Sequence, residues 1–162
     1  MKLALFLVAA LAGCSPPPAD TAVPATGERV DSIALERLPC FGTCPVYRVV
    51  IARTGRVRFA ATNPATVNVT DSVAPQGFAG LAREADAIGF WTLPGTIAES
   101  PLCGPQRTDG PSAVVTLYTA GGVKEVHDYQ GCAGVPAALR AFEERIDRVT
   151  RSERWVRPAH RG

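Results

Sequence analysis

Hydrophobic and polar residues alternate along several short stretches of this chain, as they do in β-strands with one buried face. Residues 30–38 alternate well enough for one such strand. The β-rich stretches 46–53 and 56–62 lie on either side of a Thr-Gly pair at 54–55, an arrangement typical of a β-hairpin. Residues 66–70 predict one further strand.

The following segment changes to a helical spacing of apolar residues. Pro75 suits the first turn of a helix because its φ is fixed and its missing N–H would have no partner there. Gly89 supplies a C-terminal stop. We expect residues 90–93 to pack the helix end into the core, and residues 94–111 to form a long loop. The apolar residues at helical spacing are Phe78, Leu81, Ala82, Ala85 and Ile88.

A second hairpin and a second helix complete the predicted domain. Residues 113–118 and 123–129 flank Ala-Gly-Gly at 120–122, and Pro136 begins the last helix. The order is strands, helix, strands, helix, and hairpins link the strands. We therefore predict an α+β fold, an antiparallel sheet built from two hairpins with two helices packed on it. The apolar stripe of the last helix is Leu139, Phe142, Ile146 and Val149.

The last helix is expected to end in a solvated basic segment around Trp155. Contact with anionic lipid headgroups is the alternative role for this segment. Its arginines are Arg148, Arg151, Arg154, Arg157 and Arg161.

The N-terminus has the pattern of a secretory signal peptide. Lys2 precedes a short apolar stretch at 3–10, and small residues follow before Cys14. The stretch has about half of the roughly 20 apolar residues that a membrane-spanning helix needs. Leu-Ala-Gly-Cys at 11–14 resembles the lipobox of bacterial lipoproteins. The resemblance implies cleavage before Cys14, a diacylglyceryl thioether on its sulfur and acylation of its new amino group.

The lipobox divides the chain into four predicted parts: a signal peptide at 1–13, a lipidated cysteine with a Pro-rich tether at 14–28, a single domain at 29–156 and a basic tail at 157–162. Ser15 is not the Asp that retains many lipoproteins at the inner membrane, so the resemblance implies the outer membrane, facing the periplasm. The net charge of +2 argues against a nucleic-acid partner.

The remaining four cysteines form an even set once Cys14 is lipidated, in an envelope where disulfides persist. Fully extended, Cys40 and Cys44 would lie ~13 Å apart, but Gly42 and Pro45 permit a turn that closes this gap. A disulfide between Cys103 and Cys132 would close a loop of about 30 residues and contribute roughly 3–4 kcal/mol. Four cysteines allow three connectivities, so pairing of either early cysteine with Cys103 or Cys132 stays open.

The Cys40-x-x-x-Cys44-Pro45 segment also has a chemical interpretation, as a thiol–disulfide exchange site or a copper or zinc site. It resembles the copper site of cytochrome-oxidase assembly proteins, which bind Cu(I) through thiolates. In those proteins a helix follows the motif, whereas here the next segment is β-rich. A metal would need a third ligand, and His127 is the only histidine away from the C-terminus.

No catalytic constellation is evident in the sequence, and we predict no cofactor. His127 and Asp128 are neighbours on a predicted strand, so their side chains should point to opposite faces. Asp109 fits a turn residue better than a catalytic base. An enzyme that uses Asp109 has no support beyond the length of its loop.

Several segments resemble the bacterial family called domain of unknown function 6438. The distinctive one is Cys-x-Gly-Thr-Cys-Pro-x-Tyr at 40–47. Weaker matches are Ile-x-Leu at 33–35, Thr-Gly-x-Val at 54–57 and Phe-Trp-x-Leu at 90–93. That family contains many predicted lipoproteins and has no established activity. The resemblance therefore implies no catalytic residues for this chain. Against that family's usual pattern, Cys103 and Cys132 are additions.

These observations favour an envelope lipoprotein with a non-enzymatic binding or scaffold domain, tethered to the membrane through its lipid anchor. Its partner would be an envelope protein or ligand. The alternative is a copper- or zinc-binding or thiol-redox protein centred on Cys40 and Cys44.

Overall fold

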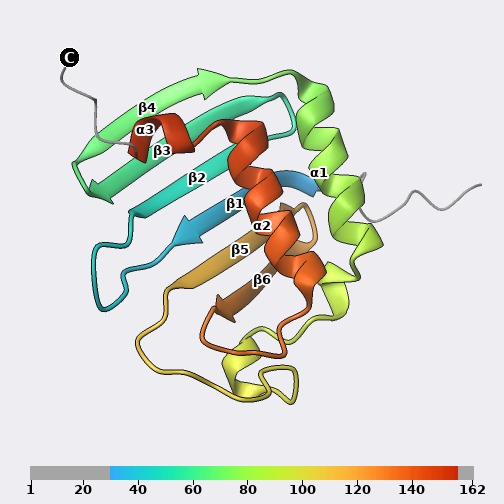
Figure 1. Cartoon of the computed structure of the whole chain (residues 1–162). Coiled ribbons are helices and arrows are strands. Elements are labelled where there is room, and N and C mark those ends of the chain that lie inside the picture. The colour runs from blue at the N-terminus through green and yellow to red at the C-terminus, as the bar shows by residue number, and fades with distance from the viewer. Residues whose placement is uncertain (1–29, 157–162) are drawn as a thin grey trace, which may run out of the picture.

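Six antiparallel strands form one sheet, and the helices lie on one face of it (Figure 1). The structure is a computed structural model and describes residues 30–156. The spatial order of the strands is β4-β3-β2-β1-β5-β6. The fold is therefore α+β with an antiparallel sheet, as the sequence predicts. The strands are β1 (Val30–Arg37), β2 (Val46–Ala52), β3 (Arg56–Asn63), β4 (Val67–Ser72), β5 (Ser112–Thr119) and β6 (Gly122–Tyr129).

The expectation of a sheet built from two hairpins needs correction, because β1 joins all the strands into a single sheet. Leu35 on β1 pairs with Val49 on β2 and with Val115 on β5. Ile33 and Leu35 are fully buried on one face of β1, and the small Ala34 is buried on the other face, between Ser32 and Glu36. A strand of this kind belongs in the middle of a sheet. Its pairing with β5 joins residues about 80 positions apart, and local alternation carries no information about that contact.

Within residues 30–156, the order of elements also includes three short helices beyond the predicted strands, helix, strands, helix. Helix α1 (Pro75–Ala87) begins at the predicted proline and is followed by Gly89 at a φ of +68°. Two short 3₁₀ helices, η2 (Phe90–Thr92) and η3 (Ile97–Glu99), occupy part of the segment before β5. The last elements are α2 (Ala137–Thr150) and the short α3 (Glu153–Val156).

The basic helix end does not continue unbroken to Trp155. Helix α2 ends where Arg151 adopts a left-handed φ of +57°, and a separate turn of helix then places Trp155 against Phe59, with ring centroids 4.8 Å apart. Arg154 lies over the Trp155 ring and pairs with Asp71 on β4. This end of the domain is therefore folded back onto the sheet rather than fully solvated.

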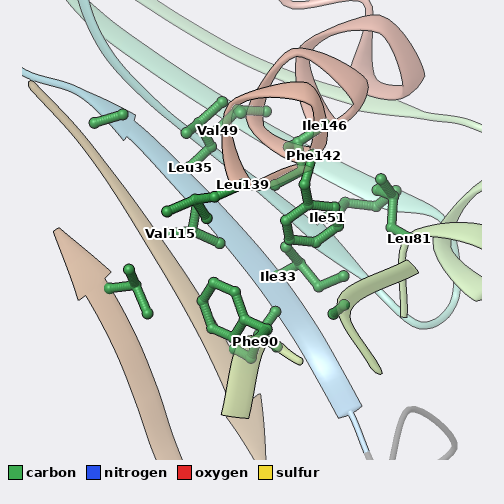
Figure 2. Packing of buried hydrophobic residues seen from close by; sticks show 14 of the residues in the cluster. Ile33, Leu35, Val49, Ile51, Leu81, Phe90, Val115, Leu139, Phe142 and Ile146 are labelled. Carbon is green, nitrogen blue, oxygen red and sulfur yellow. The ribbon is translucent and has the colours of Figure 1, made fainter. Parts of the chain in front are cut away.

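The core lies between the sheet and the helices (Figure 2). The predicted helix stripes are confirmed, since Leu81 on α1 and Phe142 on α2 are fully buried. Phe90 after α1 is buried as expected, and its ring lies 6.0 Å from that of Phe142. The strands contribute Ile33, Leu35, Val49, Ile51 and Val115 to the same cluster.

The predicted signal peptide, Cys14, the tether and the tail at 157–162 lie outside the described residues. Within residues 30–156, every helix is too short or too polar to cross a membrane.

Candidate functional site

The two disulfides join Cys40 to Cys44 and Cys103 to Cys132, which selects one of the three connectivities. The first closes the turn between β1 and β2 and brings its Cα atoms to 5.7 Å. Gly42 lies in this turn at a φ of +148°, a conformation that favours glycine. The neighbouring Phe41 is 89% exposed, so the small disulfide-closed turn projects an aromatic ring into solvent.

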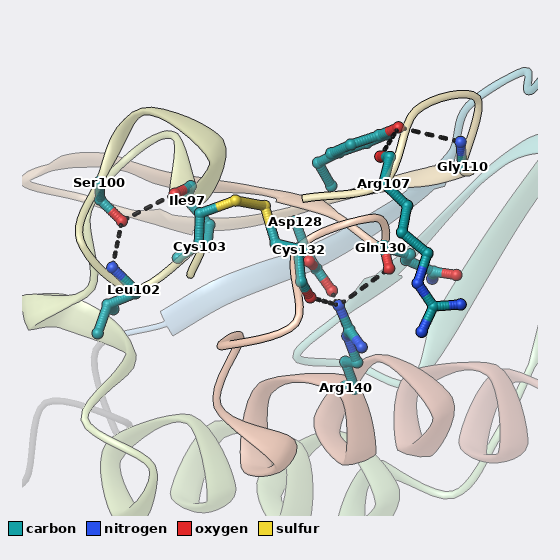
Figure 3. The surroundings of a disulfide bond; sticks show 11 residues. Ile97, Ser100, Leu102, Cys103, Arg107, Gly110, Asp128, Gln130, Cys132 and Arg140 are labelled. Carbon is teal, nitrogen blue, oxygen red and sulfur yellow. Dashed lines mark hydrogen bonds and ion pairs between the residues drawn. A yellow bond between two sulfur atoms is a disulfide. The ribbon is translucent and has the colours of Figure 1, made fainter. Parts of the chain in front are cut away.

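The second disulfide is buried beside the segment that follows η3 (Figure 3). Backbone bonds support it: the Gly134 N–H donates to the carbonyl of Cys103, and the Arg107 N–H donates to that of Gly131. The predicted long loop is thus fixed to the connection between β6 and α2. Asp109, in the same loop, has a left-handed φ of +64°, as its interpretation as a turn residue predicts.

The metal candidates are not brought together. The sulfur atoms of Cys40 and Cys44 are bonded to each other, while His127 on β6 contacts Glu125 at 2.7 Å. This contact with His127 lowers the pKa of Glu125. Among residues 30–156, no three His, Cys, Asp or Glu side chains are arranged so as to hold a metal ion.

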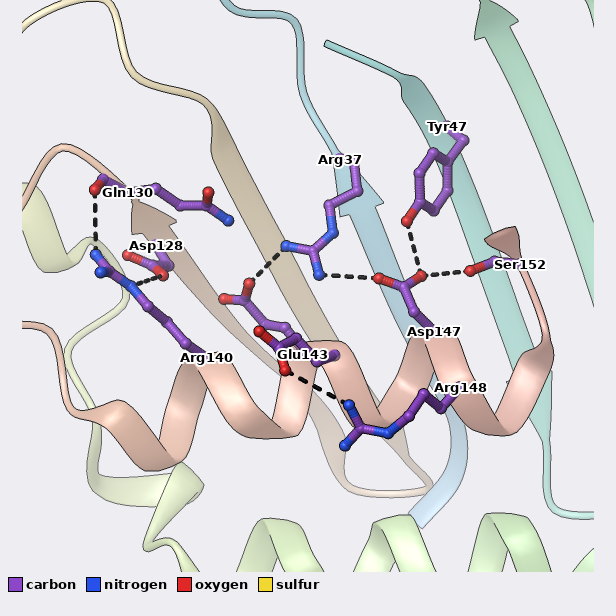
Figure 4. Close-up of polar contacts among 10 residues, drawn as sticks. Arg37, Tyr47, Asp128, Gln130, Arg140, Glu143, Asp147, Arg148 and Ser152 are labelled. Atoms are coloured by element: carbon purple, nitrogen blue, oxygen red, sulfur yellow. Dashed lines mark hydrogen bonds and ion pairs between the residues drawn. The ribbon is translucent and has the colours of Figure 1, made fainter. Parts of the chain in front are cut away.

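His127 and Asp128 lie on opposite faces of β6, as predicted. His127 is exposed, whereas Asp128 is only 1% exposed and faces α2. Arg140 on α2 donates from Nε to the Asp128 carboxylate at 3.2 Å and from Nη2 to the carbonyl of Cys132 at 2.8 Å (Figure 4, Figure 3). One arginine therefore ties the buried carboxylate to the backbone beside the second disulfide.

A polar network that the sequence did not predict runs along α2 (Figure 4). Arg37, at the end of β1, donates to Glu143 at 2.7 Å and to Asp147 at 2.9 Å. Asp147 also accepts bonds from the hydroxyls of Tyr47, at 2.7 Å, and Ser152. Burial raises the pKa of Tyr47 and the Asp147 charge adds to this effect, so the phenol remains a donor. Tyr47 of the family-like motif thus anchors β2 to α2.

Glu143 and Asp128 form a buried carboxyl pair within this network. Burial raises the pKa of Glu143 to about 7, and Asp128 adds to the rise while Arg37 opposes it. Glu143 Oε1 and Asp128 Oδ1 are both buried and accept no hydrogen bond from any donor in residues 30–156. A proton on Glu143 supplies the missing donor between the two carboxyl groups. An adjoining cavity of about 330 Å³ is lined by Glu143, Arg140, Arg37, Tyr47 and Cys44, among others.

The opposite face of the sheet carries no helix in the described part of the chain (Figure 1). We call it the open face. Residues of β1 to β5 line a hollow of about 650 Å³ there. All of its charged lining residues are arginines, and we call it the arginine hollow. Its lining residues are Ser32, Arg48, Val50, Ala52, Arg56, Arg58, Phe59, Ala60, Asn68, Val69, Thr70 and Tyr118.

The three arginines of the hollow differ in their partners. Arg48 donates to Glu36 at 2.9 Å and to the Tyr118 hydroxyl at 2.8 Å. Although burial lowers the pKa of Arg48, the bond to Glu36 and the neighbouring Tyr118 raise it overall. Arg56 and Arg58 are exposed, and within residues 30–156 their guanidinium groups have neither an ion pair nor a hydrogen bond.

Sequence reasoning missed the arginine hollow. The available signal was the alternation Arg56-Val57-Arg58-Phe59, which places two arginines on the polar face of one strand. Arg48 joins them only because β2 pairs with β3 and matches Arg48 to Ala60.

Together these features define a small α+β domain closed by two disulfides, with a helix-covered face and an open face that contains the arginine hollow. The family model described as domain of unknown function (DUF6438) matches residues 31–150, and the chain belongs to this family. No curated protein matches the chain.

Proposed function

We propose that this protein is an envelope lipoprotein, anchored through Cys14 at the outer membrane and facing the periplasm. Its domain acts by binding a partner rather than by catalysing a reaction. The open face of the sheet, and the arginine hollow in particular, is the binding surface. The lipobox-like sequence at 11–14 supports the anchor.

The observation that carries the binding proposal is the contrast between the two sheet faces. An antiparallel sheet commonly packs one face on the core and leaves the other in water. Here that second face is hollowed, and every charge that lines the hollow is positive. Two of its arginines have no internal partner in residues 30–156, so the charge is available to another molecule.

The anchor is tested by metabolic labelling with palmitate. Wild-type protein should incorporate the label, and Cys14→Ser should abolish incorporation. Ser15→Ala is the matched control because it changes the neighbouring residue and leaves the thiol in place. Persistent labelling of Cys14→Ser would contradict lipidation at this position.

The binding surface is tested by site-specific photo-crosslinking in intact envelopes. Ala60 lies in the arginine hollow, and Ala87 is an equally small exposed residue at the end of α1. A crosslinking amino acid at 60 should form a discrete adduct, and the same amino acid at 87 should not. Equal adducts at both positions, or none at 60, would rule out the open face as a surface that binds an envelope protein.

The thiol and metal alternative rests on the exposure of the Cys40–Cys44 disulfide. These cysteines are half-buried, Cys44 lines the 330 Å³ cavity, and the other disulfide is buried. Selective reduction of Cys40–Cys44 at a glutathione potential typical of the envelope would support thiol exchange. Micromolar or tighter copper binding by the reduced protein would support a metal role.

A further inference from the structure

We propose that the arginine hollow binds a phosphate monoester group, clamped between Arg56 and Arg58. This inference rests on the proposed function, since it names the chemistry of the ligand that the open face takes. The same group occurs on soluble phosphate esters and on lipid headgroups, and the clamp would recognise either source.

The clamp begins with the spacing of the two arginines on β3. Arg56 and Arg58 are two residues apart on one strand, so their side chains leave the same face about 7 Å apart. Long arginine side chains starting at that separation can converge on one small anion. Hydroxyl side chains stand directly opposite on β4, since Arg56 pairs with Ser72 and Arg58 with Thr70.

The charge of the hollow favours a doubly charged anion. Arg56 and Arg58 are not neutralised within residues 30–156, although seven other arginines there pair with carboxylates. A phosphate monoester carries up to two negative charges near neutral pH and three acceptor oxygens, which suits two guanidinium groups. A single carboxylate would neutralise only one of them. The seven paired arginines are Arg37, Arg48, Arg53, Arg140, Arg148, Arg151 and Arg154.

Arg48 and Tyr118 supply a second edge to the hollow. Arg48 is held by Glu36 and donates to the Tyr118 oxygen, so the Tyr118 O–H proton remains free to donate to a ligand. The hollow also presents Val50 and Ala60 between the polar groups, a surface that suits the organic part of an ester. Its volume of about 650 Å³ lies within the usual range for small-molecule sites.

Calorimetric titration of the purified full chain in neutral detergent tests the clamp. Phenyl phosphate is the soluble probe, dihexanoyl phosphatidic acid below its micellar concentration is the lipid probe, and benzoate is the carboxylate control. We expect saturable binding of at least one phosphate probe that weakens with salt, and at least tenfold weaker binding of benzoate. If the phosphatidic acid binds at least tenfold more tightly than phenyl phosphate, the ligand is a lipid headgroup. If phenyl phosphate binds equally or more tightly, the ligand is a soluble phosphate ester.

Arg56→Gln combined with Arg58→Gln should weaken phosphate binding tenfold or more. Arg83→Gln combined with Arg145→Gln is the matched control, because it removes the same charge from exposed arginines of α1 and α2. Circular dichroism and thermal unfolding verify that both double variants fold. Undetectable binding at millimolar probe, equal binding of benzoate, or an unaffected Arg56/Arg58 variant would overturn the phosphate clamp.

These outcomes are separable from those that test the proposed function. A crosslink from position 60 without phosphate binding would retain the open face as a binding surface and reject the phosphate chemistry. Phosphate binding without a crosslink would reject a stable envelope protein as the partner and retain the clamp.

Discussion

Glu143 and Asp128 lie against each other between α2 and β6, each with one buried carboxyl oxygen that lacks a donor in residues 30–156. Both residues are 1% exposed, and Arg37 and Arg140 bind their outer oxygens. The pair is therefore arranged to hold one proton between its inner oxygens while Arg37 and Arg140 donate to its outer oxygens. This arrangement has a direct consequence for the stability of the domain.

The first prediction concerns pH. Glu143 has a pKa of about 7 in the fold against its ordinary 4.5, so the folded state binds more protons than the unfolded state between these values. The stabilisation that protonated Glu143 provides is complete below about pH 4.5 and is lost as the pH rises through 7. Its full size is at most about 3 kcal/mol. Urea unfolding of wild type and Glu143→Gln between pH 5 and 8 measures it.

In Glu143→Gln, the amide can accept from Arg37 and donate to Asp128 at every pH. The difference in free energy of unfolding between variant and wild type should therefore rise with pH in favour of the variant. Glu144→Gln is the control, since Glu144 is the exposed neighbour on α2 and its one ion pair within residues 30–156 is with Arg148. Parallel pH profiles for wild type and Glu143→Gln would show that Glu143 does not hold the proton.

The second prediction concerns the hydroxyl of Tyr47. Tyr47→Phe removes the 2.7 Å donor to Asp147 and leaves a buried carboxylate with one bond fewer. We expect a loss of about 1–3 kcal/mol in the free energy of unfolding. Tyr118→Phe removes a hydroxyl that accepts from Arg48 on the open face, where water can replace it, and should cost less than about 1 kcal/mol. Equal effects in chemical denaturation would mean that the bond to Asp147 contributes nothing particular.

The third prediction compares the two disulfides. Replacing Cys103 and Cys132 by Ala opens a sequence separation of 29 and should cost roughly 3–4 kcal/mol. Replacing Cys40 and Cys44 opens a separation of 4 and should cost roughly 2 kcal/mol on the same chain-entropy argument. Denaturant midpoints and slopes measured for both double variants show which disulfide contributes more to the free energy of unfolding. A larger loss for the short loop would reverse the expectation.

The fourth prediction uses two phenylalanines in opposite environments. Phe142 is fully buried on the side of α2 that faces the sheet, so Phe142→Ala should lower the free energy of unfolding by about 3–5 kcal/mol. Phe41 is 89% exposed in the disulfide-closed turn, so Phe41→Ala should change the free energy of unfolding by less than about 0.5 kcal/mol. A loss above 1 kcal/mol for Phe41→Ala would indicate that its ring packs onto the domain.

Local chemistry in the sequence predicted the elements that depend on near neighbours. Pro75 and Gly89 bound α1 because proline has a fixed φ and glycine tolerates the positive φ after the helix. Alternation in residues 46–62 predicted a hairpin, and its two strands pair with each other. Gly42 permitted the turn that the Cys40–Cys44 disulfide closes. Each of these preferences acts within a few residues.

Contacts between distant residues were decided by the tertiary structure alone. Arg37 meets Glu143 across 106 positions, and only the packing of α2 on β1 brings them together. The same holds for the arginine hollow, which exists because β2, β3 and β4 lie side by side on a face that no helix of residues 30–156 covers. Alternation states which residues share a face, but burial of the whole core selects the neighbouring strands and the face that the helices cover. The sequence thus determined the strands and helices and the polar and apolar face of each, whereas tertiary packing determined which charged side chains lie next to one another.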